Sequence, residues 1–386
     1  MRIGIDASAI RSGGALTHLV EIIGALNPGD HGIERVIVWS NGRTLAKLPE
    51  RPWLDRRDEP LLNRSLPFRI FWQKFRLTRL ARKSCDLLFV PSATYSGGFR
   101  PYVTMFRNLL PFDIPERRRF RPSFRYLRYL ILERTQAASM KRASGVIFLS
   151  NVARETVTAR IGNLRGEVAM IPHGISERFR QDAKPAERTE QGKGVIRCLY
   201  VSIVNLYKHQ WHVCEAIARL RNEGIPVELD LVGPAYAPAL KRLNETLDRV
   251  DPQRKFIRYR EAVPYNELHI LYHNADIFIF ASSCENLPNI LREAMASGLP
   301  IACSRRGPMP EVLGDAGVYF DPEQPDDIAT AVRQLIQSPD LRRTCARKAL
   351  EYASQFSWER CAGETFSFLA SVASNGPSTG RDVAGA

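Results

Sequence analysis

The chain has 386 residues, 44% of them hydrophobic, and a formal net charge of +14. This length predicts two domains of about 150 to 200 residues each, and the apolar fraction is typical of a globular protein. No segment reaches the roughly 20 consecutive apolar residues of a membrane-spanning helix, and residues 1–6 have the pattern of a strand rather than a signal peptide, which favours a cytoplasmic protein.

Strand and helix patterns alternate through the first half of the chain. After a strand over 2–6, a loop containing Gly13 and Gly14 precedes a helix over about 16–26. Such alternation predicts a mostly parallel sheet. Further strands are expected at 36–39, 87–90, 102–105, 146–149 and 168–171.

Positive charge is concentrated in this first half. Residues 1–182 carry a net charge of +15, of which region 56–142 carries +14, whereas residues 183–386 carry −1. A helix over 117–134 would align an apolar stripe with arginines beside it. The stripe would contain Phe120, Phe124, Leu127 and Ile131, and the arginines are Arg117, Arg121, Arg125 and Arg128.

A basic border along an apolar stripe is typical of a helix that lies on an anionic membrane surface. We therefore predict such a surface as a partner of region 56–142. The alternative is that the stripe belongs to the core and the arginines form a solvated face. No nucleic-acid-binding motif accompanies the charge, so nucleic acid is not expected as a partner.

The second half repeats the alternating pattern after a break. Segment 183–194 is polar, contains Pro and Gly and lacks an apolar period, which is typical of a linker. We expect domains at 1–182 and 195–357, a helix over about 358–373 and a disordered tail at 374–386. The second domain should contain strands at 197–201, 228–232, 257–259, 277–280, 301–303 and 318–320.

Two carboxylates eight positions apart form the most informative motif. Glu285 follows the apolar strand 277–280, and Glu293 lies inside a helix that we expect to end at Gly298. Pro288 suits the first helical position, because its missing N–H removes nothing that the helix needs. The free N–H groups and positive dipole end of a helix start can bind a phosphate. Both acids can then face one ligand.

This motif resembles that of the retaining nucleotide-sugar glycosyltransferases of family GT4. The resemblance rests on Glu285-x7-Glu293, Gly298, Pro300 and the downstream segments 310–312 and 314–317, and it extends over residues 1–372. It implies the GT-B fold, an α/β architecture of two Rossmann-like domains facing across a cleft, in which the helix over 358–373 packs back on the first domain. Segments 207–210 and 172–175 are most similar to bacterial polysaccharide and lipopolysaccharide mannosyltransferases.

The resemblance assigns roles to three charged residues. Lys208 would meet the donor diphosphate and neutralise the leaving group. Glu293 would accept hydrogen bonds from the ribose hydroxyls, and Glu285 would orient the transferred sugar or stabilise its cationic ring. The family usually has an arginine where this chain has Ile203. Lys208 then works alone or with another arginine, for which Arg107, Arg292 and Arg305 are candidates.

Other residues are expected around the donor on the same basis. Asn286 and Pro288 replace glycines of the family, which leaves the backbone N–H groups of Leu287 and Asn289 as donors. Arg260 and Glu261 occupy the loop that holds the base. Gly13 and Gly14 allow a close backbone approach to a phosphate or sugar.

The first domain is expected to supply acceptor and sugar contacts. Thr17 and His18, at the first helix, are candidates for the acceptor together with Arg107. The family usually places a histidine near the sugar; here Asn108 or Arg107 stands in that region, and Asn108 would hydrogen-bond a sugar hydroxyl without acting as a base. For His173, a structural role in its loop is expected.

The resulting hypothesis is a retaining, metal-independent glycosyltransferase with no cofactor. It would transfer a hexose, mannose or a GDP-mannose-derived sugar, from a nucleotide diphosphate sugar, with a GDP-sugar favoured over a UDP-sugar. The acceptor would be a glycan or a lipid-linked saccharide in cell-surface polysaccharide biosynthesis, with the protein peripheral at the inner face of the cytoplasmic membrane. The alternatives are a nucleotide-sugar epimerase of the same fold and a non-catalytic membrane- or glycan-binding relative.

Metal independence rests on the sequence. No Asp-x-Asp occurs in the chain, so cations must come from side chains and helix dipoles. The seven cysteines are scattered without a C-x-x-C pair, which favours buried thiols over a disulfide framework or a zinc site.

Overall fold

The first body of the molecule is built on a sheet of seven parallel strands. We describe the computed structural model for residues 1–63, 66–180 and 194–375. The strand order is β3-β2-β1-β4-β5-β6-β7, so the order reverses between β1 and β4. The strands are β1 Arg2–Asp6, β2 Arg35–Ser40, β3 Leu54–Asp58, β4 Leu87–Val90, β5 Tyr102–Met105, β6 Gly145–Phe148 and β7 Glu167–Met170.

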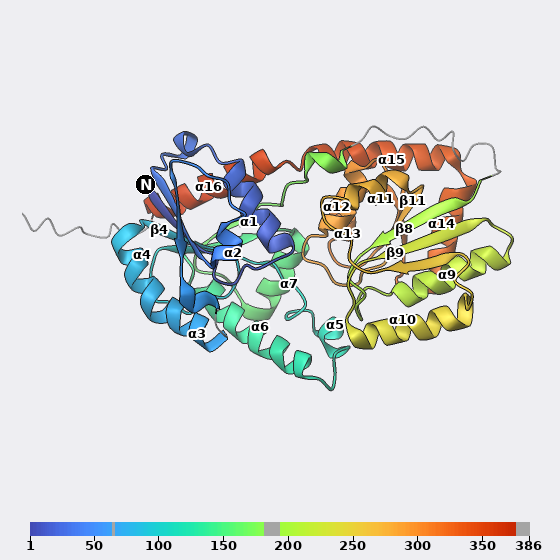
Figure 1. Ribbon diagram of the computed structural model, residues 1–386, viewed down its shortest axis with the longest axis horizontal. Helices are drawn as coiled ribbons and strands as arrows, with labels where there is room; N and C mark the ends of the chain where they lie inside the picture. The colour runs from blue at the N-terminus through green and yellow to red at the C-terminus, as the bar shows by residue number, and fades with distance from the viewer. Residues whose placement is uncertain (64–65, 181–193, 376–386) are drawn as a thin grey trace, which may run out of the picture.

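Helices cover both faces of this sheet (Figure 1). They are α1 Gly14–Gly24, α2 Gly42–Leu45, α3 Leu66–Phe71, the π-helix η3 Trp72–Leu77, α4 Thr78–Ser84, α5 Ile114–Arg118, α6 Phe124–Arg142 and α7 Asn151–Ile161. Short 3-10 turns are η1 Pro28–His31, η2 Pro60–Asn63 and η4 Glu177–Phe179.

A second sheet of six parallel strands forms the other body. Its order is β10-β9-β8-β11-β12-β13, with the reversal between β8 and β11. The strands are β8 Ile196–Val201, β9 Val227–Val232, β10 Ile257–Arg260, β11 Ile277–Phe280, β12 Ile301–Ser304 and β13 Gly317–Phe320. The helices are α9 Gln210–Asn222, α10 Ala237–Val250, α11 Leu268–Asn274, α12 Asn289–Ala296, α13 Met309–Leu313, α14 Pro325–Gln337, α15 Pro339–Ser354 and α16 Trp358–Asn375.

The strands form where short apolar runs can be buried on both faces. Every residue of β4, β5, β6, β11 and β12 is buried, as expected for a parallel sheet covered by helices. The fold predicted from the sequence, two parallel α/β units of the GT-B type, is confirmed. All seven cysteines are buried, as predicted.

Helix α16 returns from the second body to the first. It follows α15 in the chain and lies against α1 (Figure 1). Its buried residues Phe366 and Leu369 share a core with Ile3 and Ile5 of β1. Gly174 fits closely against the start of this helix, because a Cβ there would lie 2.4 Å from the Trp358 backbone nitrogen.

The helix predicted over 117–134 is wrong. The chain forms α5 and α6 instead, separated at residues 119–123 around Pro122. Phe120 is buried at 2% exposure, so it does not belong to an outer stripe, and Arg117 is buried in an ion pair with Glu133. Phe124, Leu127 and Ile131 of the predicted stripe do lie exposed on α6.

Two other expectations concern segments that the structure does not cover. The predicted linker lies outside the described residues except for Gly194, and the predicted tail lies outside them except for residues 374 and 375, which belong to α16. Within the described residues, no helix is both long and apolar enough to span a membrane.

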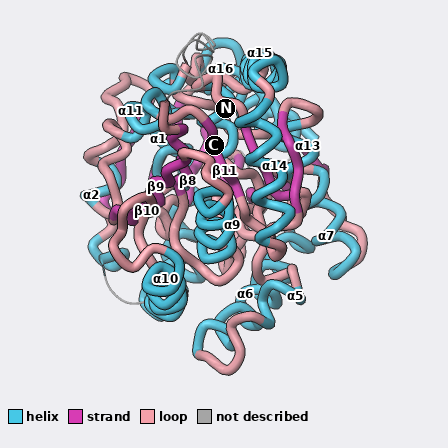
Figure 2. Tube along the Cα trace, turned by 90° about the vertical axis from the view of Figure 1, so that its right-hand side faces the viewer, coloured by secondary structure: helices cyan, strands magenta, loops and turns pink. Residues whose placement is uncertain are grey.

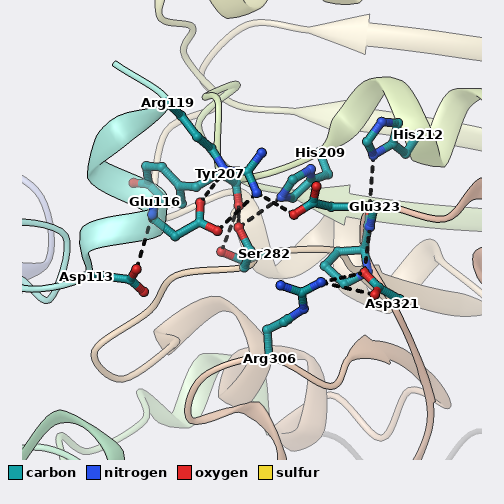
Figure 3. Close-up of polar contacts among 12 residues, drawn as sticks. Asp113, Glu116, Arg119, Tyr207, His209, His212, Ser282, Arg306, Asp321 and Glu323 are labelled. Atoms are coloured by element: carbon teal, nitrogen blue, oxygen red, sulfur yellow. Dashed lines mark hydrogen bonds and ion pairs between the residues drawn. The ribbon is translucent and has the colours of Figure 1, made fainter. Parts of the chain in front are cut away.

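The two bodies touch through polar contacts that bring their strand ends together. Arg119, just after α5, donates to Glu116 beside it and to Glu323 of the second body (Figure 3). The Glu311 carboxylate accepts the backbone N–H groups of Asn151 and Val152 at the start of α7, at 2.8 and 3.1 Å. The helix dipole favours an acid at a helix N-terminus. Glu311 therefore links the two bodies through a stabilising contact.

The loop before α12 is also attached to the first body. The Asn286 side chain donates to the Phe106 carbonyl at 2.8 Å, and the Asn286 carbonyl accepts from Ser150 at 2.7 Å. Glu285 is therefore held between the two sheets.

Candidate active site

A cavity of about 790 Å³ lies between the two bodies. It opens at the carboxyl ends of β8, β9 and β11, where Val201, Val232 and Phe280 border it, and the N-terminus of α1 closes its other side. The order of the second sheet reverses between β8 and β11. Such a reversal, at the carboxyl ends of parallel strands, is where open α/β sheets bind ligands.

Two helix N-termini meet at this cavity. Helix α1 begins after Gly13, whose φ of 66° lies in the left-handed region, and α12 begins after Pro288; neither helix has a side-chain cap. A Cβ on Gly14 would lie 3.3 Å from the amide nitrogen of Asn289. A larger residue at this position would require the Asn289 side chain to shift. The uncapped N–H groups of both helices suit an anion such as a diphosphate.

Glu293 lies in the second turn of α12 and borders the cavity. Only 7% of it is exposed, and the hydroxyls of Tyr265 and Tyr272 donate to its two oxygens at 3.3 and 3.1 Å. Burial raises the pKa of Glu293 from 4.5 to about 7, although the tyrosine hydrogen bonds and Arg292 oppose the rise. This carboxyl is therefore held at an energetic cost in the ligand-free protein.

Glu285 forms a short ion pair with Lys208. The two side chains are 17% and 5% exposed, and the Lys208 ammonium lies over the rings of Tyr207 and Phe280 at 5.3 and 5.2 Å. Glu285 borders the cavity directly, whereas Lys208 lies behind it. The sequence analysis predicted both residues at one site. It did not predict the contact between them.

Ile203 stands where the family usually has an arginine, and this position faces the cavity. Ile203 borders it with 37% of its surface exposed. Among the arginines considered as replacements, Arg305 pairs with Asp327, and the buried Arg292 donates to the His173 carbonyl and to Asn289. Arg292 therefore ties the start of α12 to the chain that joins the two bodies.

A smaller cavity of about 290 Å³ adjoins the first. Both are bordered by Gly14, Glu285, Leu287 and Asn289, and the smaller one is also bordered by Arg107. The remaining residues around the smaller cavity are Ala15, Leu149, His173 and Asn286.

Two histidine rings lie in contact at this smaller cavity: His173 borders it, and His18 is buried behind His173. The rings of His18 and His173 are 4.4 Å apart between centroids, and no ring nitrogen of either has a hydrogen-bond partner in the described part of the chain. Burial lowers the pKa of both well below 6.5, and Arg107 contributes to both shifts. Both rings are therefore neutral, which supports the structural role expected for His173.

Several predicted site residues meet at the large cavity and others do not. Its border includes Gly13, Gly14, Thr17, Glu285, Leu287, Asn289 and Glu293. His18 is fully buried away from it. Asn108 is exposed and accepts the Leu110 N–H at 3.3 Å. Arg260 and Glu261 are exposed, and the following Ala262 and Val263 border the cavity in their place.

Lys47, Arg178 and Tyr265 border the cavity and were not among the predicted site residues. Lys47 and Arg178 bring positive charge to its border, and Tyr265 contacts both Glu293 and the Arg178 guanidinium, which lies 5.3 Å from its ring centre. No local pattern marks Lys47. Arg178 lies in η4, four positions after Gly174, and no local pattern marks it either. In the described residues, no group of three or more His, Cys, Asp or Glu side chains is placed to hold a metal ion.

Comparison with protein families agrees with this geometry. The model of Glycosyltransferase Family 4 matches residues 12–179, and that of Glycosyl transferases group 1 matches residues 182–352. Together they match most of the chain, one in each body. The chain belongs to the GT4 glycosyltransferases. The family model that matches residues 182–352 includes Lys208, Glu285 and Glu293, which lie close together in the structure.

Curated relatives align with this glycosyltransferase over shorter stretches. O-antigen chain mannosyltransferase B of Escherichia coli is 38% identical over 110 residues, which are 28% of this chain and 29% of that protein. D-inositol 3-phosphate glycosyltransferase of Corynebacterium kroppenstedtii is 33% identical over 141 residues, or 36% and 31% of the two chains. The aligned stretches span less than a third of either relative.

Solved structures share the fold over nearly the whole chain. Sucrose-phosphate synthase of Thermosynechococcus elongatus has a TM-score of 0.75 at 16% identity and covers 97% of this chain and 100% of its own. Anabaena HepE, in complex with UDP and glucose, has a TM-score of 0.72 at 18% identity and covers 96% and 100%. These likenesses confirm the GT-B fold.

Proposed function

We propose that this chain is a retaining glycosyltransferase that transfers a hexose from a nucleotide diphosphate sugar to a hydroxyl of a glycan or lipid-linked acceptor. The observation that carries the proposal is the cavity in which Glu293, Glu285 and two uncapped helix N-termini face one another. A nucleotide sugar needs a carboxylate for its ribose, N–H groups for its phosphates and a polar contact for its sugar.

We infer the direction of the donor from the residues that border this cavity. The ribose would lie at Glu293, which the tyrosine hydroxyls orient, and the base would extend toward Val263 and Tyr265. The diphosphate would lie at the start of α12, near the Leu287 and Asn289 N–H groups. The sugar would then lie at Glu285, beside the smaller cavity.

The chemistry follows from these positions. Departure of the nucleoside diphosphate creates negative charge, which the two helix N-termini and Lys208 would stabilise. As the family implies, the acceptor hydroxyl would enter on the same face. Metal ions are not required in this proposal, because the chain contains no Asp-x-Asp and offers its own positive groups.

Mannose, or a sugar derived from GDP-mannose, remains the proposed hexose. The similarity to an O-antigen mannosyltransferase supports it and also supports a role in cell-surface polysaccharide biosynthesis. The solved HepE complexes hold UDP or UDP-glucose, so the base requires a direct comparison.

Calorimetry without metal tests the donor site. GDP and UDP are titrated into wild type and Glu293→Ala, with Glu261→Ala as the matched control because Glu261 is exposed outside the cavity. We expect one nucleotide to bind with a micromolar Kd and Glu293→Ala to weaken it at least tenfold, about 1.4 kcal/mol. Absence of binding by both nucleotides would contradict the proposal. Turnover of the donor without acceptor to an epimerised sugar would favour the epimerase instead.

We also propose that the enzyme works at an anionic membrane surface, as a peripheral protein on the cytoplasmic side. Helix α6 presents Phe124, Leu127 and Ile131 at 81%, 51% and 53% exposure, at helical spacing. On α3 and η3, Phe71 and Phe75 are each 55% exposed. The same elements and the chain just before α6 carry four exposed basic residues, Arg121, Arg125, Arg128 and Lys74.

The two apolar groups lie on one side of the molecule. Arg128 of α6 lowers the pKa of Arg69 on α3 through like-charge repulsion, added to the larger effect of burial, so the helices are neighbours. Both are seen along the lower edge of the first body in Figure 1, and α6 projects from the molecule in the end-on view (Figure 2). Exposed apolar side chains with a basic border suit the interface of an anionic bilayer.

A further inference from the structure

Among the described residues, no carboxylate forms an ion pair with Arg107. Arg107 follows β5, and its Nη2 donates to the Gly14 carbonyl at 2.8 Å, while its buried Nη1 has no hydrogen-bond partner in the described chain. Burial lowers the pKa of Arg107 to about 10, and no carboxylate contributes to that value. A half-buried cation without an anion is costly, which makes Arg107 a candidate ligand contact.

The surroundings of Arg107 are positive overall. The smaller cavity is bordered by one acid, Glu285, and that acid is already paired with Lys208. The neighbouring His173 is neutral and only 3% exposed, with both ring nitrogens unpartnered. Arg292, also buried, adds a second cation beside His173. A neutral hexose would leave this charge uncompensated.

The cavity is placed for the transferred sugar. It shares Glu285, Leu287 and Asn289 with the large cavity, at the helix start where the diphosphate is proposed. Its volume of about 290 Å³ is at the small end of ligand pockets. A group attached to the diphosphate and directed away from the ribose therefore enters it.

We propose that the donor sugar is a hexuronate, which replaces neutral mannose and is compatible with a GDP-mannose-derived sugar, and that Arg107 binds its carboxylate. This inference rests on the proposed function, since it assigns the sugar of the same donor. The guanidinium is a suitable partner because it stays charged when buried and donates to carboxylate oxygens. It would also distinguish a uronate from the corresponding neutral hexose, which cannot supply the anion.

Binding of three ligands to wild type, to variants at Arg107 and to a control variant tests the inference. The ligands are the free nucleoside diphosphate, its neutral hexose conjugate and its hexuronate conjugate: UDP, UDP-glucose and UDP-glucuronate, or GDP, GDP-mannose and GDP-mannuronate. The variants are Arg107→Gln, which keeps a donor for the Gly14 carbonyl, and Arg347→Gln, an exposed control on α15. Charge-assisted hydrogen bonds correspond to about 10- to 100-fold in affinity.

We expect wild type and Arg347→Gln to bind the hexuronate conjugate at least tenfold more tightly than the neutral one. Arg107→Gln should lose this preference while its affinity for the free nucleoside diphosphate changes less than about threefold, and Arg107→Lys should restore part of it. Equal affinity of wild type for both conjugates overturns the inference. So does an equal loss for the free nucleotide in Arg107→Gln, because Arg107 would then serve the diphosphate.

The same titrations separate this inference from the proposed function. If wild type binds no nucleoside diphosphate, the donor site itself is refuted, and the hexuronate assignment with it. If the diphosphate binds but wild type does not distinguish the two sugars, only the assignment of Arg107 fails. An anion on the acceptor would give this second result, together with an effect of Arg107→Gln on the acceptor KM.

Discussion

Replacing Glu293 by Gln should stabilise the ligand-free enzyme above pH 7 and weaken nucleotide binding at the same time. The buried carboxyl has its pKa raised from 4.5 to about 7, mainly by burial. Below pH 4.5 the group is protonated in both the folded and the unfolded state. As the pH rises toward 7, the unfolded state ionises first, and the wild type loses stability that Glu293→Gln retains.

The expected size follows from the two pKa values. A difference of one pKa unit corresponds to about 1.4 kcal/mol. The two-state linkage relation then gives a penalty of about 1 kcal/mol at pH 5 and about 3 kcal/mol at pH 8. Glutamine avoids most of this penalty, because its oxygen still accepts from one tyrosine and its shape is nearly the same.

Urea unfolding of wild type and Glu293→Gln at several pH values measures this effect. The stability gap between them should widen by about 2 kcal/mol from pH 5 to pH 8. The exposed Glu261→Gln serves as control and should show no such widening. A gap that stays constant with pH would refute the reasoning about Glu293, and a tighter-binding nucleotide in Glu293→Gln would refute its role at the ribose.

Three further perturbations have defined outcomes. Lys208→Ala should lower turnover at least 100-fold, because one charge-stabilising group is lost, and near-normal turnover in a kcat assay would remove Lys208 from the mechanism. The double variant Phe124→Ser with Leu127→Ser should reduce sedimentation with anionic vesicles at least tenfold while soluble-substrate turnover stays unchanged; equal binding would contradict the membrane surface. Gly174→Ala should lower the free energy of unfolding by about 1–3 kcal/mol in urea titrations, because its Cβ would lie 2.4 Å from the Trp358 nitrogen. An unchanged midpoint would show that the backbone relaxes freely.

The sequence predicts buried elements well because burial leaves a local signature. Strands such as 87–90, 102–105 and 277–280 agree with the structure at both ends, since each is an apolar run buried on both faces. Strand β3 was missed because Leu54–Asp58 contains two arginines and two aspartates and is exposed at its end. Its pairing with β2 at the sheet edge provides the structure that its own residues do not indicate.

The broken helix has a related cause. Spacing alone aligned Phe120 with Phe124, but Pro122 disfavours a helical conformation at the residue before it. The chain therefore turns at residues 119–123, and Phe120 enters the core against Tyr129. Pro122, as a helix-breaking residue, therefore indicated the local structure better than the helical spacing of the apolar residues did.

At the site, motif residues were predictable and orientations were not. Glu285, Glu293 and the N–H groups of α12 share one short segment, so their proximity follows from local structure. His18 and Thr17 are adjacent in α1, yet Thr17 borders the cavity while His18 is buried against His173 and Trp358. Which of the two neighbours faces the cavity depends on how α1 packs against residues distant in the chain. The sequence of α1 alone does not give this information.

The Lys208–Glu285 ion pair bears on how the chain binds the donor without the arginine that the family usually has at position 203. A lysine with a 5% exposed side chain is stable when a carboxylate balances it, and Glu285 does so in the ligand-free protein. In the proposed function, a diphosphate would compete with Glu285 for this cation, and Glu285 would then be available to the sugar. Glu285→Gln should therefore bind the nucleoside diphosphate at least as tightly as wild type while its turnover falls, as titration calorimetry and kcat would show. Loss of nucleotide affinity in Glu285→Gln would mean that the pair positions Lys208 for the phosphates and does not compete with them.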